Sequence, residues 1–211
     1  MRQNKYPGKF IVFEGLDGSG SSTQAEKLVA WLKSQKIKAA LAKEPTNNIV
    51  GGLIRGQLTH DWKSSQECLQ LLFAADRAHH LEKEIIPLLQ SGVWVICDRY
   101  LFSTVAFGSL EIPEKDWLLS LNERFIMPDL TIILKVSPEN CIKRMEDSRF
   151  SIELFETRDK LSRVWRAYQW LNEKFFDYSV VIDGQQNIAE VAKKVETVVT
   201  DKILKYYKPK K

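Results

Sequence analysis

The sequence of 211 residues predicts an α/β fold, in which a five-stranded parallel sheet carries helices on both faces. Two observations predict it. Short apolar runs of strand length alternate along the chain with longer stretches of helical periodicity. These runs are apolar almost throughout, which is typical of strands buried on both faces of a parallel sheet. The chain has no internal repeat and no linker, so residues 1–211 are predicted to form a single domain.

The predicted elements follow one another in a regular order. The five apolar runs are Phe10–Phe13, Ala39–Ala42, Val93–Cys97, Leu130–Val136 and Val180–Ile182. The helical stretches fall at about Thr23–Gln35, Gln66–Gln90, Glu114–Phe125, Pro138–Met145, Phe155–Phe176 and Ile188–Leu204. In the first of these, Leu28, Trp31 and Leu32 share one face of the helix. Because ligands bind at the carboxyl ends of the strands in such a sheet, we expect the chemistry just after each strand.

The composition and the chain ends exclude several classes of protein. The formal net charge of +4 is too mild to predict a nucleic-acid partner. No apolar run reaches the roughly 18 residues of a membrane span, and residues 1–9 lack the apolar core of a signal peptide. Three widely spaced cysteines indicate neither a disulfide framework nor a metal site. We therefore expect a cytoplasmic protein with no membrane partner. The basic tail, residues 205–211, is expected to be a frayed end, with nucleic acid or lipid contact as the alternative.

The first strand leads into a glycine-rich loop. Gly15 and Gly20 have the G-x-x-x-x-G spacing of the P-loop, whose backbone N–H groups bind phosphate at the start of a helix. Ser22 stands where the loop's hydroxyl residue reaches Mg²⁺, but Ser21 replaces the lysine before it, and no loop residue is basic. The pattern predicts a P-loop NTPase fold, with a ligand-free turn as the alternative. The predicted ATP phosphate-binding residues are Gly15, Gly18, Ser19, Gly20, Ser21, Ser22 and Thr23.

Charged side chains follow the other predicted strands. Asp98 comes directly after the third strand, where a Walker-B carboxylate holds Mg²⁺, and Arg99 beside it can bind a phosphate with two parallel hydrogen bonds. A structural Asp–Arg pair is the alternative. Asp17, inside the loop, is useful if it meets a substrate hydroxyl or a metal ion, and otherwise caps the next turn. Glu44 follows the second strand, in a segment that is equally compatible with a plain loop.

Two further pairs of residues indicate a base site and a lid. Phe73 and Arg77 are four residues apart on one helix, so a planar base can stack on the ring and bond to the guanidinium. Phe73 as an ordinary core residue is the alternative. Arg144 and Arg149 lie in a predicted short lid, about residues 144–157, which would exclude water and neutralise phosphoryl charge. A solvated helix end is the alternative there.

These motifs together resemble thymidylate kinases, which are nucleoside monophosphate kinases of the P-loop class. The matching segments occur in the family's order over most of the chain: Phe13–Gly20, Thr23-Gln24, Glu44-Pro45, Leu72–Arg77, Asp98–Tyr100 with Ser103 and Ala106, Pro128–Leu130 and Arg149-Phe150. The resemblance implies transfer of the ATP γ-phosphoryl group to dTMP, which gives dTDP and ADP, with Mg²⁺ as cofactor. It also implies a homodimer.

The resemblance assigns roles around the acceptor nucleotide. It implies that Phe73 stacks on thymine, that Arg77 bonds to the base and that Arg99 holds the acceptor phosphate. Asp17 would lie near the 3′-hydroxyl or the metal, and Phe107 would crowd a 2′-hydroxyl. The monophosphate site also includes Glu44 and Ser103.

The remaining roles implied by the resemblance concern the donor side. Ser22 and Asp98 would serve Mg²⁺, and Arg144 and Arg149 would be lid arginines. Asp17, Arg99, Arg144 and Arg149 are therefore the predicted catalytic residues.

The chain also departs from the family's pattern. Ser21 replaces the P-loop lysine, Phe107-Gly108 stands where bacterial members often carry Tyr-Gln, and Thr46-Asn47 replaces a glycine pair or an arginine. We expect the missing charge to come from the lid, through Arg149 first and Arg144 second. Two alternatives stay open: a kinase for another monophosphate such as dUMP, and a catalytically inactive nucleotide-binding homologue.

Overall fold

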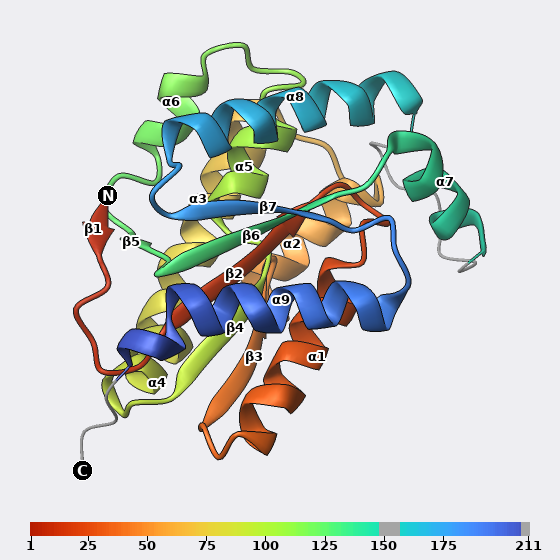
Figure 1. The fold of residues 1–211 in the computed structure, drawn as a ribbon. Coiled ribbons are helices and arrows are strands. Elements are labelled where there is room, and N and C mark those ends of the chain that lie inside the picture. Colours follow the sequence, from red (N-terminus) through yellow and green to blue (C-terminus); the bar gives the residue numbers. More distant parts are fainter. Residues whose placement is uncertain (148–156, 208–211) are drawn as a thin grey trace.

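The computed structural model describes residues 1–147 and 157–207, and it confirms the predicted α/β fold (Figure 1). Five parallel strands form the sheet in the order β3-β4-β2-β6-β7. In that order their bounds are Ala39–Lys43, Trp94–Asp98, Phe10–Gly15, Leu130–Lys135 and Ser179–Asp183. Each strand matches a predicted apolar run to within two residues, because only these runs have enough apolar surface for the interior of the sheet.

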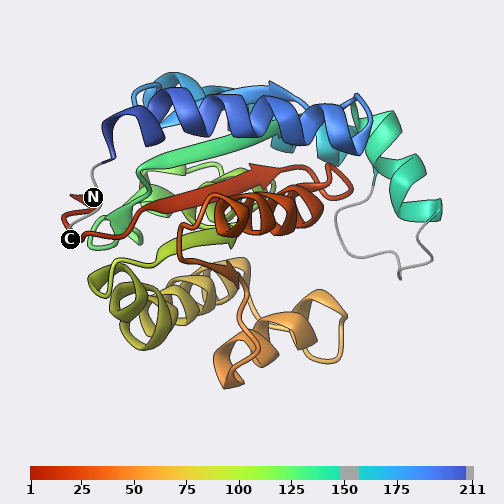
Figure 2. The same cartoon turned by 60° about the horizontal axis from the view of Figure 1, so that its bottom comes forward.

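Helices cover both faces of the sheet, as predicted (Figures 1 and 2). α1 (Ser21–Ser34) and α9 (Ile188–Lys202) pack on one face, where their apolar stripes form a buried cluster with the strands. The other face is covered by α5 (Leu101–Gly108), α8 (Arg158–Lys174) and the helical run of residues 66–90. The two apolar clusters fix the sheet between them, so the carboxyl ends of its strands hold a constant position.

Several helices begin at a side-chain cap that the sequence supplies locally. Asn48, Ser65, Thr157 and Asn187 each accept a hydrogen bond from the backbone N–H three residues further on. Ser65 begins a continuous run of α3 (Gln66–His80), a π-helical turn (Leu81–Ile85) and α4 (Ile86–Gln90). This run confirms the predicted helix over residues 66–90.

Some short elements were not predicted. α2 (Ile49–Leu58) contains Gly51-Gly52, which suggests a turn by sequence, and α5 is buried nearly all round, so it shows no helical periodicity. β1 (Arg2–Gln3) and β5 (Ile126–Met127) pair with each other but are too short to show a pattern. The predicted helix over residues 114–125 was too long, because α6 spans only Lys115–Ser120 before the chain turns into β5.

The carboxyl ends of the strands lie between α2 on one side and α7 (Pro138–Asp147) on the other, as Figure 2 shows. Residues 144–147 of the predicted lid form the last turn of α7, and residues 148–156 lie outside the described residues.

The prediction of a frayed C-terminal tail was wrong for residues 205–207. Residues 204–206 form a 3₁₀ turn, and the Tyr207 ring packs edge-on against the buried Trp94 ring at 5.0 Å. Residues 208–211 lie outside the described part.

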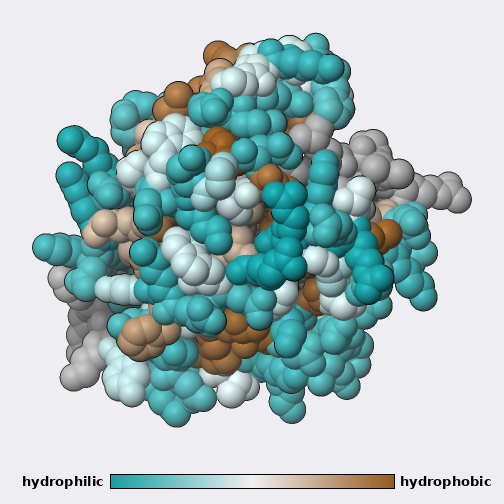
Figure 3. All heavy atoms as spheres, turned by 90° about the horizontal axis from the view of Figure 1, so that it is seen from above, coloured by the Kyte–Doolittle hydropathy of each residue, from teal (hydrophilic) through white to brown (hydrophobic). Residues whose placement is uncertain are grey.

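The face seen from above is mostly hydrophilic, with scattered apolar patches, the broadest of which lies near the lower centre of the view (Figure 3). Within residues 1–147 and 157–207, no helix is both long enough and apolar enough to cross a bilayer.

Candidate active site

The P-loop joins β2 to α1 and leaves the start of that helix open. α1 has Gly20 at its N-cap position, with a left-handed φ of 91° and no side chain that caps the helix. Gly18 has a φ of 77°, and a Cβ there would lie 2.5 Å from the carbonyl oxygen of Cys141. Both positions therefore require glycine. An uncapped helix N-terminus presents backbone N–H groups and partial positive charge, which favour a phosphate ligand.

Ser22 and Asp98 lie together beside this loop, which is where the sequence predicted Mg²⁺. The Ser22 hydroxyl donates to Oδ2 of Asp98, and Oδ1 of Asp98 is buried with no partner. Burial opposes ionisation of Asp98, but Arg99, Ser22 and Lys43 together hold its pKa below the usual value. The site thus offers an ionised carboxylate with a free oxygen next to a hydroxyl, a donor set that fits Mg²⁺ in company with nucleotide phosphates.

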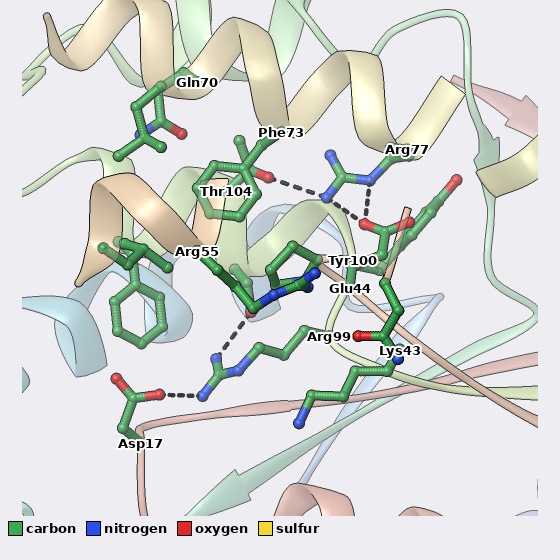
Figure 4. Close-up of a pocket in the computed structure, with 16 residues that line it drawn as sticks. Asp17, Lys43, Glu44, Arg55, Gln70, Phe73, Arg77, Arg99, Tyr100 and Thr104 are labelled. Carbon is green, nitrogen blue, oxygen red and sulfur yellow. Dashed lines mark hydrogen bonds and ion pairs between the residues drawn. The ribbon is translucent and has the colours of Figure 1, made fainter. Parts of the chain in front are cut away.

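Two cavities meet above the sheet. The first, about 460 Å³, is lined by Phe73, Arg77, Thr104, Phe107 and other residues of α2, α3 and α5 (Figure 4). The second, about 960 Å³, lies over the P-loop and includes Arg144. Asp17, Lys43 and Arg99 line both. The structure therefore places two ligand spaces side by side, with charged residues at their junction.

Arg99 is held at this junction by three protein oxygens. Its guanidinium donates to Oδ1 of Asp17 at 2.5 Å, to the carbonyl of Gly15 at 3.0 Å and to Oγ of Ser103 at 3.0 Å. It also lies over the Phe107 ring, 5.0 Å from its centroid. The residue has a left-handed φ of 71°, which is costly for a side chain other than glycine and typical of functional sites.

Arg77 is fully buried in a polar network at the base of the first cavity. Nε and Nη2 both donate to Glu44, Nη2 also donates to Thr104, and Nη1 donates to Asn122. Glu44 accepts in addition from His80 at 3.2 Å. Because a guanidinium has five N–H groups, these contacts leave one Nη1 hydrogen for a ligand. The sequence placed Phe73 and Arg77 on one face, and both do line the cavity, but it did not show that Glu44 pairs with Arg77.

Glu14 is a buried carboxyl that sequence reasoning missed. It accepts hydrogen bonds from the backbone N–H groups of Tyr100 and Ser103 and from the Tyr168 hydroxyl, and thereby caps α5 from a neighbouring strand. Burial raises the pKa of Glu14 to about 7, although Ser103, Arg99 and Tyr168 act in the opposite direction. A glutamate within the apolar run 10–15 was the only signal in the sequence.

The raised pKa of Glu14 predicts a pH effect on stability. The folded state binds the Glu14 proton more tightly than the unfolded state, so this group's contribution to stability is complete below pH 4.5 and is lost as the pH rises to about 7. We expect the free energy of unfolding of Glu14→Gln, relative to that of the wild type, to rise by about 3 kcal/mol between pH 4.5 and 7.5. Urea titrations of both proteins measure the difference. A constant difference across this range would contradict the prediction.

Arg144, one of the two predicted lid arginines, contacts the P-loop backbone. From α7 it donates to the carbonyl of Ser19 at 3.3 Å and to that of Gly184 at 3.0 Å. Arg149, the other predicted lid arginine, lies outside the described residues.

Lys43 is a further site residue that the sequence analysis missed. Its Nζ lies 3.3 Å from Oδ2 of Asp98. Its position directly before Glu44, at the end of a strand, was the available signal.

Comparisons with known proteins agree with this geometry. A sequence model of the family described as Thymidylate kinase matches residues 13–195. The probable thymidylate kinase of Pyrococcus abyssi is 34% identical over 202 residues, which cover 93% of this chain and 98% of that protein. The thymidylate kinase of Plasmodium falciparum is 34% identical over 203 residues, with 95% and 93% covered. A solved structure of thymidylate kinase from Candida albicans has a TM-score of 0.79 at 25% identity and covers 94% of this chain and 93% of that one. The chain therefore belongs to the thymidylate kinase family.

Proposed function

We propose that this protein transfers the γ-phosphoryl group of ATP to the 5′-phosphate of dTMP, giving dTDP and ADP. The observation that carries the proposal is the junction of the two cavities at Asp17 and Arg99. One cavity is floored by the P-loop, and the other holds an aromatic ring and a guanidinium on one helix face. Family membership supports the same reaction.

Catalysis in this site would be positioning and charge neutralisation. An oxygen of the dTMP phosphate forms the new bond to the γ-phosphorus, and the bond from that phosphorus to the β,γ-bridging oxygen breaks, with its electron pair left on ADP. Arg99 orients the attacking phosphate, and the N–H groups at the start of α1 hold the donor. No general base is needed, because the acceptor phosphate is already an anion near neutral pH.

Ser22 and Asp98 are the residues that would hold Mg²⁺, which when bound neutralises phosphate charge. Asp98 would serve this purpose with its ionised carboxylate, whose Oδ1 has no hydrogen-bond partner within the protein. Arg144, which already contacts the P-loop, would bind donor phosphates from the lid side together with Arg149.

A coupled assay of ADP release with a panel of monophosphates tests the proposal. We expect dTMP to give the highest kcat/KM and dUMP to give a lower one. A higher value for another monophosphate would assign a different acceptor. Nucleotide binding without turnover on any acceptor would show an inactive homologue instead.

The sugar contact is tested by Phe107→Ala. The Phe107 ring lies in the acceptor cavity beneath the Arg99 guanidinium, and we expect it to crowd a 2′-hydroxyl. The substitution should narrow the ratio of kcat/KM between dTMP and its ribonucleotide counterpart by about tenfold, because the extra hydroxyl then finds space. An unchanged ratio in a folded variant would place sugar discrimination elsewhere.

We also expect a homodimer. α2 and α3 pack on each other and carry exposed apolar side chains, among them Ile49, Leu53 and Leu71, with exposed fractions of 85%, 45% and 52%. Burial of such side chains against a second copy would stabilise the pair. Light scattering with size-exclusion chromatography measures the mass in solution.

A further inference from the structure

The P-loop of this chain lacks the positively charged side chain that a P-loop lysine supplies to the ATP phosphates. Ser21 stands at the lysine position and is buried, and its hydroxyl helps to lower the pKa of the Asp98 carboxyl. A serine hydroxyl cannot neutralise the β- and γ-phosphates of ATP. A cation must therefore reach these phosphates from elsewhere in the site.

Three cations line the cavity over the P-loop within the described part of the chain: Lys43, Arg99 and Arg144. Arg99 is anchored by Asp17, Gly15 and Ser103, and Arg144 by two backbone carbonyls. Lys43 differs from both. Its ammonium makes an ion pair with Asp98 at 3.3 Å, and its side chain is 62% exposed. It is thus the cation in this cavity with the greatest freedom to exchange its partner for a phosphate.

The sheet fixes where Lys43 starts from. Lys43 is the last residue of β3 and is the register partner of Asp98 in β4, which in turn pairs with Phe13 in β2, just before the P-loop. Its Nζ approaches the same Asp98 oxygen that accepts from Ser22. Figure 4 shows the side chain extending toward the space beside Arg99 and Asp17, where the two cavities meet.

We propose that Lys43, in place of the lid arginines expected from the sequence, replaces the missing P-loop lysine, so that its ammonium binds the β- and γ-phosphates of ATP from the strand next to the loop. The inference rests on the proposed function. A lysine acts as a point charge on a flexible four-carbon stem, so its reach matters more than its place in the sequence. When ATP is bound, Lys43 leaves Asp98 for the phosphates, and Asp98 becomes free to serve the metal.

A swap of the two positions tests this. We expect Lys43→Ala to lower kcat/KM for ATP by about 100-fold, while the KM for dTMP changes by less than threefold. The double variant Lys43→Ala/Ser21→Lys should have a kcat/KM for ATP at least tenfold higher than that of Lys43→Ala, because the new lysine approaches the same phosphates from the loop. Lys43→Arg should keep more activity than Lys43→Ala. Lys38→Ala is the matched control, since it removes the same charge at the opposite, exposed end of β3 and should leave the kinetics unchanged.

Unchanged ATP kinetics in Lys43→Ala would overturn the inference, as would a loss that Ser21→Lys does not relieve. Calorimetric titration of the same variants with ATP and Mg²⁺ gives a second measurement that needs no turnover. Weaker ATP binding in Lys43→Ala that is restored by the added Ser21→Lys supports the inference. If the wild type binds ATP but phosphorylates none of the monophosphates, the proposed function fails, and this binding measurement still tests the role of Lys43.

A separate observation concerns the acceptor cavity. Gln70 lines it and is 3% exposed, and its Oε1 is buried with no hydrogen-bond partner. Gly108 makes room for this carboxamide, because a Cβ there would lie 3.0 Å from both Cδ and Oε1 of Gln70. Gln70 is three residues before Phe73 on α3, and the two share a helix face (Figure 4). A rotation of this carboxamide would turn its unsatisfied carbonyl toward a ligand that lies beside the aromatic ring.

We infer that Gln70 reads the edge of the base, with Oε1 accepting from the imide N3–H of thymine while the ring stacks on Phe73. This inference also rests on the proposed function. The wild type should prefer dTMP to its N3-methylated analogue, as measured by the ratio of their kcat/KM values. Gln70→Ala should lower this ratio about tenfold, because it removes both the acceptor for N3–H and the side chain that crowds the N3-methyl group. Gln66→Ala, one turn earlier on α3, is the matched control.

An unchanged ratio in a Gln70→Ala protein of normal melting temperature would show that Gln70 only fills space. If the wild type uses another monophosphate in preference to dTMP, the proposed function fails. Calorimetric binding of thymidine and N3-methylthymidine to the wild type and to Gln70→Ala still tests the contact in that case.

Discussion

Arg99→Lys is expected to lower kcat/KM for dTMP by about 10³-fold, the largest effect on activity that the site predicts. The guanidinium makes directed contacts with Asp17, Gly15 and Ser103 at 2.5–3.0 Å, and its left-handed backbone aims it at the junction of the two cavities. Lysine keeps the positive charge but cannot form two parallel hydrogen bonds to the acceptor phosphate. The acceptor is then misplaced relative to the γ-phosphorus, and small misplacements cost large factors in rate.

Steady-state kinetics with each substrate varied in turn measure this effect. The KM for ATP should change little, because the P-loop backbone holds the donor. Lys38→Ala again serves as the control for a change at an exposed basic residue. Wild-type kinetics in Arg99→Lys would show that Arg99 is structural, and its contacts with Asp17 and Ser103 would then be its whole function.

Arg77→Ala is expected to lower the free energy of unfolding by about 3–5 kcal/mol, the largest effect on stability. The side chain is 1% exposed and pairs with Glu44, and its removal leaves a buried carboxylate without its main partner. The Thr104 hydroxyl and Asn122 lose partners as well. For a chain of this length such a loss lowers the melting temperature by roughly 10 °C.

Phe73→Ala provides the contrast, because Phe73 lines the cavity but holds no buried charge. It should weaken dTMP binding by about 1–3 kcal/mol and leave ATP binding nearly intact. Arg77→Ala should weaken dTMP binding and destabilise the fold together. Thermal melting with and without dTMP separates these effects. An Arg77→Ala protein of wild-type stability would mean that Glu44 finds another cation.

Much of the fold could be predicted because it depends on local patterns. The apolar run before Gly15 and the helical periodicity after Gly20 located the P-loop, and the four-residue spacing of Phe73 and Arg77 placed both on one face. α5 escaped prediction because burial on all sides removes the periodicity that marks a helix. Lys205 to Tyr207 were assigned to a frayed end because nothing nearby in the sequence indicates that Tyr207 packs on Trp94.

The sequence by itself determined the α/β class, the phosphate loop, the absence of its lysine and the residue types of an acceptor site. Only the tertiary structure decided which of these residues work together. Lys43 lies beside Asp98 because β3 pairs with β4 in one register, and Glu14 caps α5 because β2 lies beneath it. Gln70 fills the space over Gly108 because α3 packs on α5. Each contact joins residues far apart in the chain, and strand order and helix packing, which local sequence does not encode, set the distances between them.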